Sequence, residues 1–185
     1  MQKNIYNKNT AKKMKIILLL IIILTFLAGC GSIYDLNNFI LPDDIEFIRL
    51  VEELNTPKKI CQYMLDNFTF KSYPYICLTP YQLYIIKKGD CNDYANFAIF
   101  IAHYHDYETY QIIIFFLNDT YRHSIAVYKE DLYSFSDNGY YFTGKYNYTT
   151  FLEIAEYDCY LRDKKYLKYV VYDYDMNIVE TGYND

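Results

Sequence analysis

Apolar residues recur with a helical period through the first half of the chain beyond residue 42. They lie three to four residues apart in residues 45–54, in residues 57–68 behind Thr56, and in residues 80–86 behind Thr79. A threonine followed by proline suits the start of a helix, because proline lacks the amide hydrogen that a helix start leaves unpaired. The pattern therefore predicts helices over these three segments.

A fourth helix is expected directly after Gly89. Asp90 stands where an N-cap belongs and Asp93 follows three residues later, which resembles a capping box with aspartate in place of glutamate. On or near the helix face that carries Cys91 there are three alanines, Ala95, Ala98 and Ala102. Because small residues allow close packing, we expect this helix to be central and its cysteine to point inward.

Beyond residue 106 the pattern changes from a helical to an alternating one. Five segments indicate β-strands: residues 110–117, 121–128, 132–136, 167–174 and 177–181. The pair Asn138-Gly139 is a strong signal for a hairpin turn. In the second strand, His123 shares a face with Ile125 and Val127, and we expect that face to meet the helix that begins at Cys91. Helices followed by antiparallel strands predict an α+β domain.

The N-terminus indicates an export signal rather than a part of the fold. Residues 1–15 carry five lysines and no acid, and an apolar run follows up to Leu27. That run is too short for a comfortable membrane span of about 20 residues. Its end, Leu27-Ala28-Gly29-Cys30, resembles the lipobox of bacterial lipoproteins, which implies cleavage before Cys30 and lipid on that residue. A plain signal peptide and a single-pass anchor are the alternatives.

The expected organisation is a signal peptide over residues 1–29, a lipidated tether over residues 30–41 and one domain over residues 42–185. Lipid on Cys30 would hold this domain on the cell membrane, facing outside the cytoplasm. Loss of residues 1–29 removes five lysines and no acid, so the net charge changes from −5 to −10. Because nucleic acid is bound largely by neutralising its phosphates, so acidic a domain argues against nucleic acid as a partner.

Four cysteines follow Cys30: Cys61, Cys77, Cys91 and Cys159. This number is too low to indicate a disulfide framework in a domain of this length. In an exported protein Cys61 and Cys77 could form a disulfide, and the alternative is that both are free thiols packed as small apolar residues.

Cys91 has the position of a nucleophile. A thiolate at a helix N-terminus is stabilised by the helix dipole and by the free amides. It also needs a base that takes its proton and a third group that orients the base. His103 and His105 lie near the far end of the same helix, so His123 is the remaining histidine for the role of base. The alternative for His123 is an ordinary core histidine.

Asp137 is the expected orienting group. It follows Phe135 on the same face of the next strand, and a hairpin would place that strand beside His123. The alternative is that Asp137 serves only the turn that follows it. Asn138 and Asp131 are the substitutes if the strand register is shifted or if the loop folds differently.

Three short motifs together resemble the transglutaminase-like cysteine protease superfamily: GDCNDYA at residues 89–95, RHSIAVY at residues 122–128 and YSFSDN at residues 133–138. The order cysteine, histidine, aspartate matches, with spacings of 32 and 14 residues. The resemblance covers roughly residues 56–138. It implies a papain-like or transglutaminase-like core, with Cys91 as nucleophile, His123 as base and acid, and Asp137 as orienting group.

The same resemblance implies acyl transfer through a thioester on Cys91. With water as acceptor the protein would be a peptidase or amidase acting on a peptide or protein substrate, and with an amine as acceptor it would cross-link proteins. The leading hypothesis is a membrane-anchored, extracytoplasmic thiol hydrolase. The rival is a non-catalytic lipoprotein that uses the fold as a binding or structural module. The presence of all three residues, Cys91, His123 and Asp137, argues against the rival.

Two possible metal motifs are incomplete. Residues 173–177 begin like a calcium loop, but the glycine and glutamate that such a loop requires further on are missing. His103 and His105 with Asp106 are expected to be solvated residues at a helix end. We therefore expect neither a metal nor another cofactor.

Overall fold

The computed structural model describes residues 36, 39–72, 77–143 and 148–184. The expected signal peptide and the lipobox cysteine, Cys30, lie outside the described residues. None of the helices in the described ranges has both the length and the apolar character that a bilayer span requires.

Four helices occupy the N-terminal half of the described chain, as predicted. They are α2 (Ile45–Glu53), α3 (Pro57–Asn67), α4 (Pro80–Ile86) and α5 (Cys91–Tyr104). In each, a side chain just before the first turn accepts a backbone N–H: Asp44, Thr56, Thr79 and Asp90. These bonds satisfy amides that a helix start leaves unpaired, so the sequence itself determines where each helix begins.

A short parallel pair of strands holds the segment that leads into α5. Strand β1 (Thr69–Phe70) follows α3 and pairs with β2 (Lys88–Gly89). The amide of Lys71 donates to the carbonyl of Gly89 at 2.8 Å. The backbone immediately before Cys91 is therefore tied to the chain that leaves α3.

The C-terminal half forms a six-stranded antiparallel sheet with the order β6-β5-β4-β3-β7-β8. Its strands are β3 (Glu108–Phe116), β4 (Arg122–Lys129), β5 (Tyr133–Asp137), β6 (Tyr140–Phe142), β7 (Tyr166–Asp173) and β8 (Ile178–Tyr183). Asn138 and Gly139 form the turn between β5 and β6 with φ values of 47° and 92°, as the hairpin signal predicted. The mixed architecture confirms the α+β prediction.

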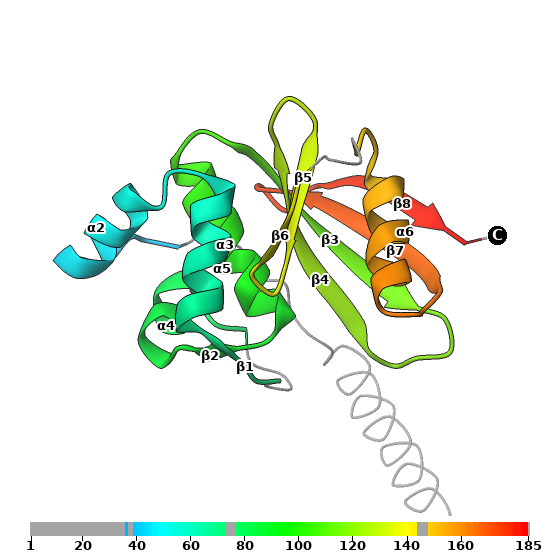
Figure 1. The fold of residues 1–185 in the computed structure, drawn as a ribbon, viewed down its shortest axis with the longest axis horizontal. Helices are drawn as coiled ribbons and strands as arrows, with labels where there is room; N and C mark the ends of the chain where they lie inside the picture. Colours follow the sequence, from blue (N-terminus) through cyan, green and yellow to red (C-terminus); the bar gives the residue numbers. More distant parts are fainter. Residues whose placement is uncertain (1–35, 37–38, 73–76, 144–147, 185) are drawn as a thin grey trace, which may run out of the picture. The chain divides into compact units, whose positions relative to one another are not determined.

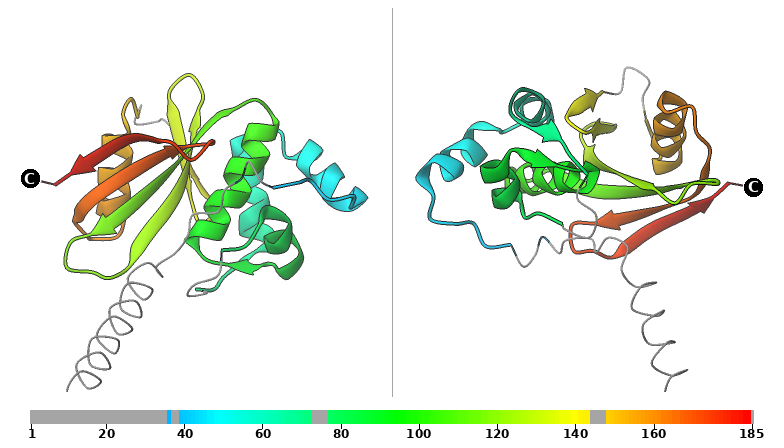
Figure 2. Two further views of the ribbon diagram at one scale, coloured as in Figure 1. Left: turned by 180° about the vertical axis from the view of Figure 1, so that it is seen from behind. Right: turned by 90° about the horizontal axis from the view of Figure 1, so that it is seen from below.

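One helix was not predicted. Helix α6 (Phe151–Leu161) lies between β6 and β7, and it contacts β7 and β3. Figures 1 and 2 show it over the sheet, away from the group formed by α2 to α5. Its sequence does carry a start signal, because Thr150 and Glu153 form a capping box ahead of the apolar residues Ile154 and Ala155.

The sheet separates two clusters of buried apolar side chains. One joins α2 to α5 with Ala126 and Tyr128 of β4, and the other joins α6 with β3, β5, β7 and the alternate residues Ile125 and Val127 of β4. Strand β4 is thus buried on both faces. The expectation that Ile125 and Val127 face the helix beginning at Cys91 is wrong: they face α6, and the intervening residues face α5.

Helix α5 is central, as expected. Every residue from 93 to 102 is buried, and the helix contacts α3, α4, β3 and β4. Packed residues also begin before residue 42. Leu36 belongs to the cluster around α5, and the ring of Phe39 meets the ring of Phe100 edge-on at 4.7 Å. The core therefore includes residues that the sequence analysis assigned to the tether.

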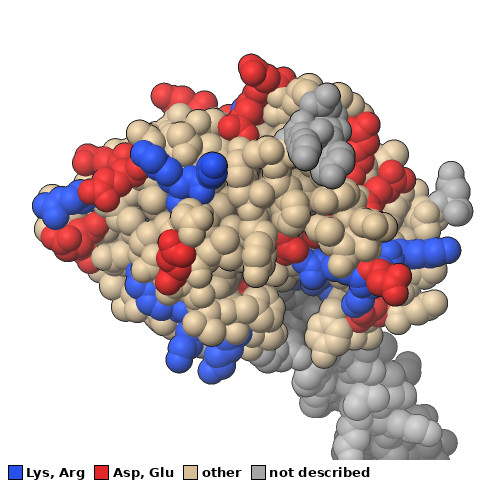
Figure 3. All heavy atoms as spheres, in the orientation of Figure 1, with Lys and Arg blue, Asp and Glu red and all other residues tan. Residues whose placement is uncertain are grey.

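The surface carries charges of both signs. On the face shown in Figure 3, lysine and arginine side chains are interspersed with aspartate and glutamate and form no continuous basic area. That face lacks the basic stripe expected of a surface that binds nucleic acid.

Candidate active site

The capping box at the start of α5 fixes the backbone around Cys91. The Asp90 carboxylate accepts the amides of Asn92 and Asp93 at 3.0 and 3.3 Å, and the Asp93 carboxylate accepts the amide of Asp90 at 2.9 Å. Cys91 is the first residue of this 14-residue helix and is half-buried. Its sulfur therefore lies at the end of the helix where the dipole favours negative charge.

Gly89 is required by close packing. A Cβ atom at this position would lie 2.7 Å from Cδ1 of Leu83 and 2.8 Å from Cβ of Asp93. Asp93 is completely buried there and also accepts the amide of Leu78 at 2.7 Å. Burial raises the pKa of Asp93 to about 6, against the opposing effect of its two backbone hydrogen bonds. The Gly-Asp-Cys-x-Asp sequence is thus a single packed unit.

The structure brings His123 and Asp137 together. Nε2 of His123, on β4, lies 2.9 Å from Oδ1 of Asp137, the last residue of β5. The register that pairs Ala126 with Ser136 carries Asp137 toward the start of β4. Of the three acidic or amide residues considered for this place, Asp137 is the one that contacts the ring, whereas Asn138 lies in the turn.

Cys91 completes this cluster. Its side chain lies close enough to the ring of His123 to raise the pKa of that ring. Nε2 of the ring contacts Asp137, so Nδ1 is the ring nitrogen that does not bind this carboxylate. The structure therefore brings together all three residues that the sequence pointed to, from a helix start, a strand start and a strand end.

His123 is buried among charged groups. Burial lowers its pKa, but the hydrogen bond to Asp137, the hydrogen bond and charge of Cys91 and the charge of Asp158 outweigh burial and raise the pKa to about 9. Asp137 shows the complementary shift: burial raises its pKa, and His123 and Arg162 together hold it below the usual value. The pair thus favours an imidazolium beside a carboxylate.

A second set of hydrogen bonds ties α5 to β4 next to the site. Nε2 of Gln111 donates to Oδ1 of Asn92 at 2.9 Å and to Oγ of Ser124 at 2.7 Å. Asn92 follows Cys91 in the chain, and Ser124 follows His123. Gln111, from β3, therefore links the neighbour of Cys91 to the neighbour of His123.

Two further charged residues reach the cluster from α6 and its C-terminal end. Arg162 donates from Nη2 to Oδ2 of Asp137 at 2.5 Å and from Nε to Oδ2 of Asp158 at 3.0 Å. Its Nη2 also lies 2.6 Å from Nε2 of His123. Neither residue was predicted for the site, because α6 itself was not predicted, although the capping box at Thr150 marks its start.

The same cluster contains the single group of potential metal ligands with suitable spacing in the described ranges. One ligand atom each from His123, Asp137 and Asp158 lie within 4.8 Å of one another. Arg162 already donates to both carboxylates. A cation at this place would therefore have to displace the guanidinium, so these residues fit a metal poorly.

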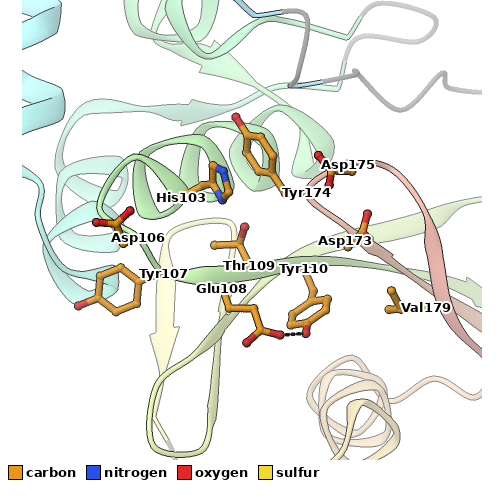
Figure 4. A pocket seen from close by; sticks show the side chains of 10 residues that line it. All are labelled: His103, Asp106, Tyr107, Glu108, Thr109, Tyr110, Asp173, Tyr174, Asp175 and Val179. Carbon is orange, nitrogen blue, oxygen red and sulfur yellow. Dashed lines mark hydrogen bonds between the residues drawn. The ribbon is translucent and has the colours of Figure 1, made fainter.

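The other histidines lie elsewhere. The ring of His103 stacks on Tyr174 with the centroids 3.5 Å apart, and Nε2 of His105 lies 2.7 Å from the carbonyl of Val51. Figure 4 shows His103 beside Tyr174 at a cavity of about 450 Å³ that adjoins the C-terminal end of α5. Cys91 lies at the opposite, N-terminal end of α5, so this cavity does not adjoin its thiol.

The described cysteines are free thiols, including Cys61 and Cys77, which the sequence analysis considered as a pair. Cys61 is buried near the hydroxyl of Tyr128, with the sulfur and oxygen 3.9 Å apart. Cys77 accepts hydrogen bonds from the side-chain amides of Asn92 and Asn96 at 3.0 and 3.2 Å. The two thiols thus have separate surroundings.

No protein-family model and no curated protein matches the chain. Among solved structures, it is similar to LapG of Legionella pneumophila at 13% sequence identity and a TM-score of 0.44. The match covers 65% of this chain and 70% of LapG for the calcium-bound form and for a second LapG structure, and 74% and 73% for the EGTA-treated form. Similarity at this level does not assign an activity, which has to be argued from the site.

Substitution of Gly89 by alanine should disturb the start of α5. The added Cβ has to push Leu83 and Asp93 aside, so we expect a loss of about 1–3 kcal/mol in the free energy of unfolding and slower alkylation of Cys91. Urea denaturation and mass spectrometry of the alkylated peptide measure the two effects. Gly182→Ala is the matched control, because its clash with the Tyr169 ring lies on β8. Equal effects of both variants on Cys91 would contradict the argument.

The raised pKa of His123 predicts a pH-dependent contribution to stability. A histidine that binds its proton more tightly when folded stabilises the fold fully below its unfolded value of about 6.5, and this contribution is lost as the pH rises through about 9. We therefore expect His123→Gln to lower the free energy of unfolding more at pH 6 than at pH 10, measured by urea denaturation. A difference that is constant or grows with pH would show that the ring is not held as an imidazolium.

Proposed function

We propose that this protein is a thiol hydrolase that cleaves amide bonds of a peptide or protein by acyl transfer through Cys91. The observation that carries the proposal is the 2.9 Å contact between His123 and Asp137, with the side chain of Cys91 close enough to the same ring to raise its pKa. Its members come from α5, β4 and β5, so the fold, not local sequence, assembles them. The resemblance of three sequence motifs to transglutaminase-like cysteine proteases agrees with the same roles.

Each residue would have a defined part in the reaction. Nδ1 of His123 holds the proton that the thiol has given up, and the thiolate of Cys91 attacks the carbonyl carbon of the amide. The C–N bond then breaks as the imidazolium returns the proton to the leaving amine, which leaves a thioester on Cys91. His123 next takes a proton from water, whose oxygen attacks the thioester, and the acid and the thiol are released. Asp137 holds Nε2–H throughout, so the ring keeps the orientation in which Nδ1 faces sulfur.

The start of α5 would also stabilise the developing oxyanion. The Asp90 side chain accepts the amides of Asn92 and Asp93, the two residues that follow Cys91. The amide of Cys91 itself would therefore donate to the oxyanion that forms on the substrate carbonyl oxygen when the sulfur attacks. Removal of one such donor costs about 3 kcal/mol in other enzymes.

We further propose that lipid on Cys30 anchors the domain to the outer side of the cell membrane. The support is the sequence of residues 1–30, with its basic start, its apolar run and the motif Leu27-Ala28-Gly29-Cys30. Substrates would then be proteins that meet the membrane surface outside the cytoplasm.

Alkylation of Cys91 tests the nucleophile directly. We expect iodoacetamide to modify Cys91 faster than the half-buried Cys77 at pH 6.5, because the imidazolium stabilises the thiolate. His123→Ala should lower the rate for Cys91 about 10-fold or more and leave Cys77 unchanged. Mass spectrometry of the two peptides gives both rates from one sample.

Hydrolysis of a peptide-amide library by the same proteins separates the possible activities. Cys91→Ala should abolish cleavage, with a loss of at least about 1000-fold. Incorporation of a labelled amine in place of water would indicate a cross-linking enzyme. A thiol whose alkylation is slow and unaffected by His123→Ala would instead indicate a non-catalytic module.

Metabolic labelling with an alkyne fatty acid tests the anchor. In a bacterial host we expect the full chain to incorporate the label and to sediment with membranes, and Cys30→Ser to lose the label completely. Cys61→Ser is the control and should keep it. Labelled Cys30→Ser protein would rule out lipid attachment at this residue.

A further inference from the structure

Helix α6 and its C-terminal end supply an ion pair that touches the site described above. Asp158 and Arg162 lie one helical turn apart, and Oδ2 of Asp158 accepts Nε of Arg162 at 3.0 Å. From there the guanidinium reaches Oδ2 of Asp137 at 2.5 Å. One arginine thus joins two carboxylates that come from different parts of the fold.

The buried carboxylate of Asp158 is expected to destabilise the fold. Its side chain is fully buried, and Oδ1 has no hydrogen-bond partner in the part of the chain that the structure describes, although it lies 3.9 Å from Nε2 of His123. A buried carboxylate with one unpaired oxygen destabilises a fold compared with an apolar side chain of similar size. Stability therefore does not explain the charge of Asp158, whereas its contact with the guanidinium of Arg162 does.

The two contacts of Nε2 place opposite demands on that nitrogen. Asp137 at 2.9 Å needs a donor, whereas the N–H of Arg162 at 2.6 Å needs an acceptor. A ring nitrogen with a proton can satisfy only the carboxylate, and one without a proton only the arginine. In the proposed reaction Nε2 keeps its proton at every step, so the productive bonds of Arg162 are those to the carboxylates.

We propose that Asp158 and Arg162 are positioning residues for the reaction at Cys91. Asp158 holds the guanidinium, and the guanidinium holds Oδ2 of Asp137, so that Oδ1 accepts the Nε2–H of His123. This inference rests on the proposed function, because it assigns the pair a role in orienting the base. The charged groups that face His123 are Cys91 from α5, Asp137 from β5, and Asp158 and Arg162 from α6 and its end.

A double-mutant cycle in the full-length protein tests the proposal. We expect Arg162→Met to lower the alkylation rate of Cys91 about 10-fold, as Asp137→Asn does, and the double variant to be no slower than either single one. Effects that do not multiply would mean that Arg162 acts through Asp137. Arg162→Lys should recover part of the rate, because an ammonium can still bind one carboxylate.

Nitrogen-15 NMR of labelled histidines measures the protonation and hydrogen bonding of the His123 ring directly. A purely structural role of Arg162 would leave this signal unchanged. We expect the Nε2–H signal of His123, assigned by its absence in His123→Ala, to be present in the parent and lost in Arg162→Met and in Asp137→Asn. Lys164→Met is the matched control. Lys164 lies two residues after Arg162 and pairs with Asp119. Its substitution removes that ion pair and should leave both the signal and the rate unchanged.

Folding is separated from positioning by a further variant. Asp158→Asn combined with Arg162→Met removes both charges and leaves no uncompensated buried ion, so we expect it to melt within a few degrees of the parent and still to lose the Nε2–H signal. Retention of that signal, or a rate for Arg162→Met within twofold of the parent, would overturn the proposal. If His123→Ala does not slow alkylation, the proposed function fails, while the NMR signals still decide whether Arg162 orients the ring.

Discussion

The reciprocal hydrogen bonds between Asp90 and Asp93 determine where Cys91 lies, and the neighbouring structure depends on them. Asp93 is fully buried and also bonds the amide of Leu78, so the capping box is anchored in the core rather than on the surface. Gly89 allows the approach, because any side chain there would collide with Asp93. A cap on an exposed helix could fray without consequence, whereas this one fixes the thiol of Cys91 at a helix end near His123.

Strand β4 explains how one histidine can lie near a thiol on one helix and near charged residues on another. Because neighbouring side chains of a strand point to opposite faces, Ser124 is turned toward α5 while His123 shares its face with the residues that meet α6. Gln111 then ties Ser124 to Asn92, the residue after the thiol. Because β4 is buried on both faces, residues at its start lie near the thiol of α5 on one side and near the charged residues of α6 on the other.

The parts of the fold that could be predicted from the sequence are those encoded locally. The helix starts at Thr56, Thr79 and Asp90 and the turn at Asn138 depend on residues a few positions apart, and all four are confirmed. The face of β4 that meets α5 was predicted wrongly because alternation does not say which of two apolar faces meets which helix. Helix α6 had a local signal at Thr150 that was not used, so its charged residues were missed as well.

The ion pair on α6 shows why a site of this kind cannot be completed from motifs alone. Asp158 and Arg162 follow Asp137 by more than twenty residues and belong to no motif of the nucleophile or the base. Yet both reach the groups around His123: the charge of Asp158 helps to raise the pKa of the ring, and Arg162 donates to the carboxylates of both Asp158 and Asp137. On the proposal above, the orientation of Asp137 depends on this guanidinium, and the buried carboxylate of Asp158 is what holds the guanidinium in place.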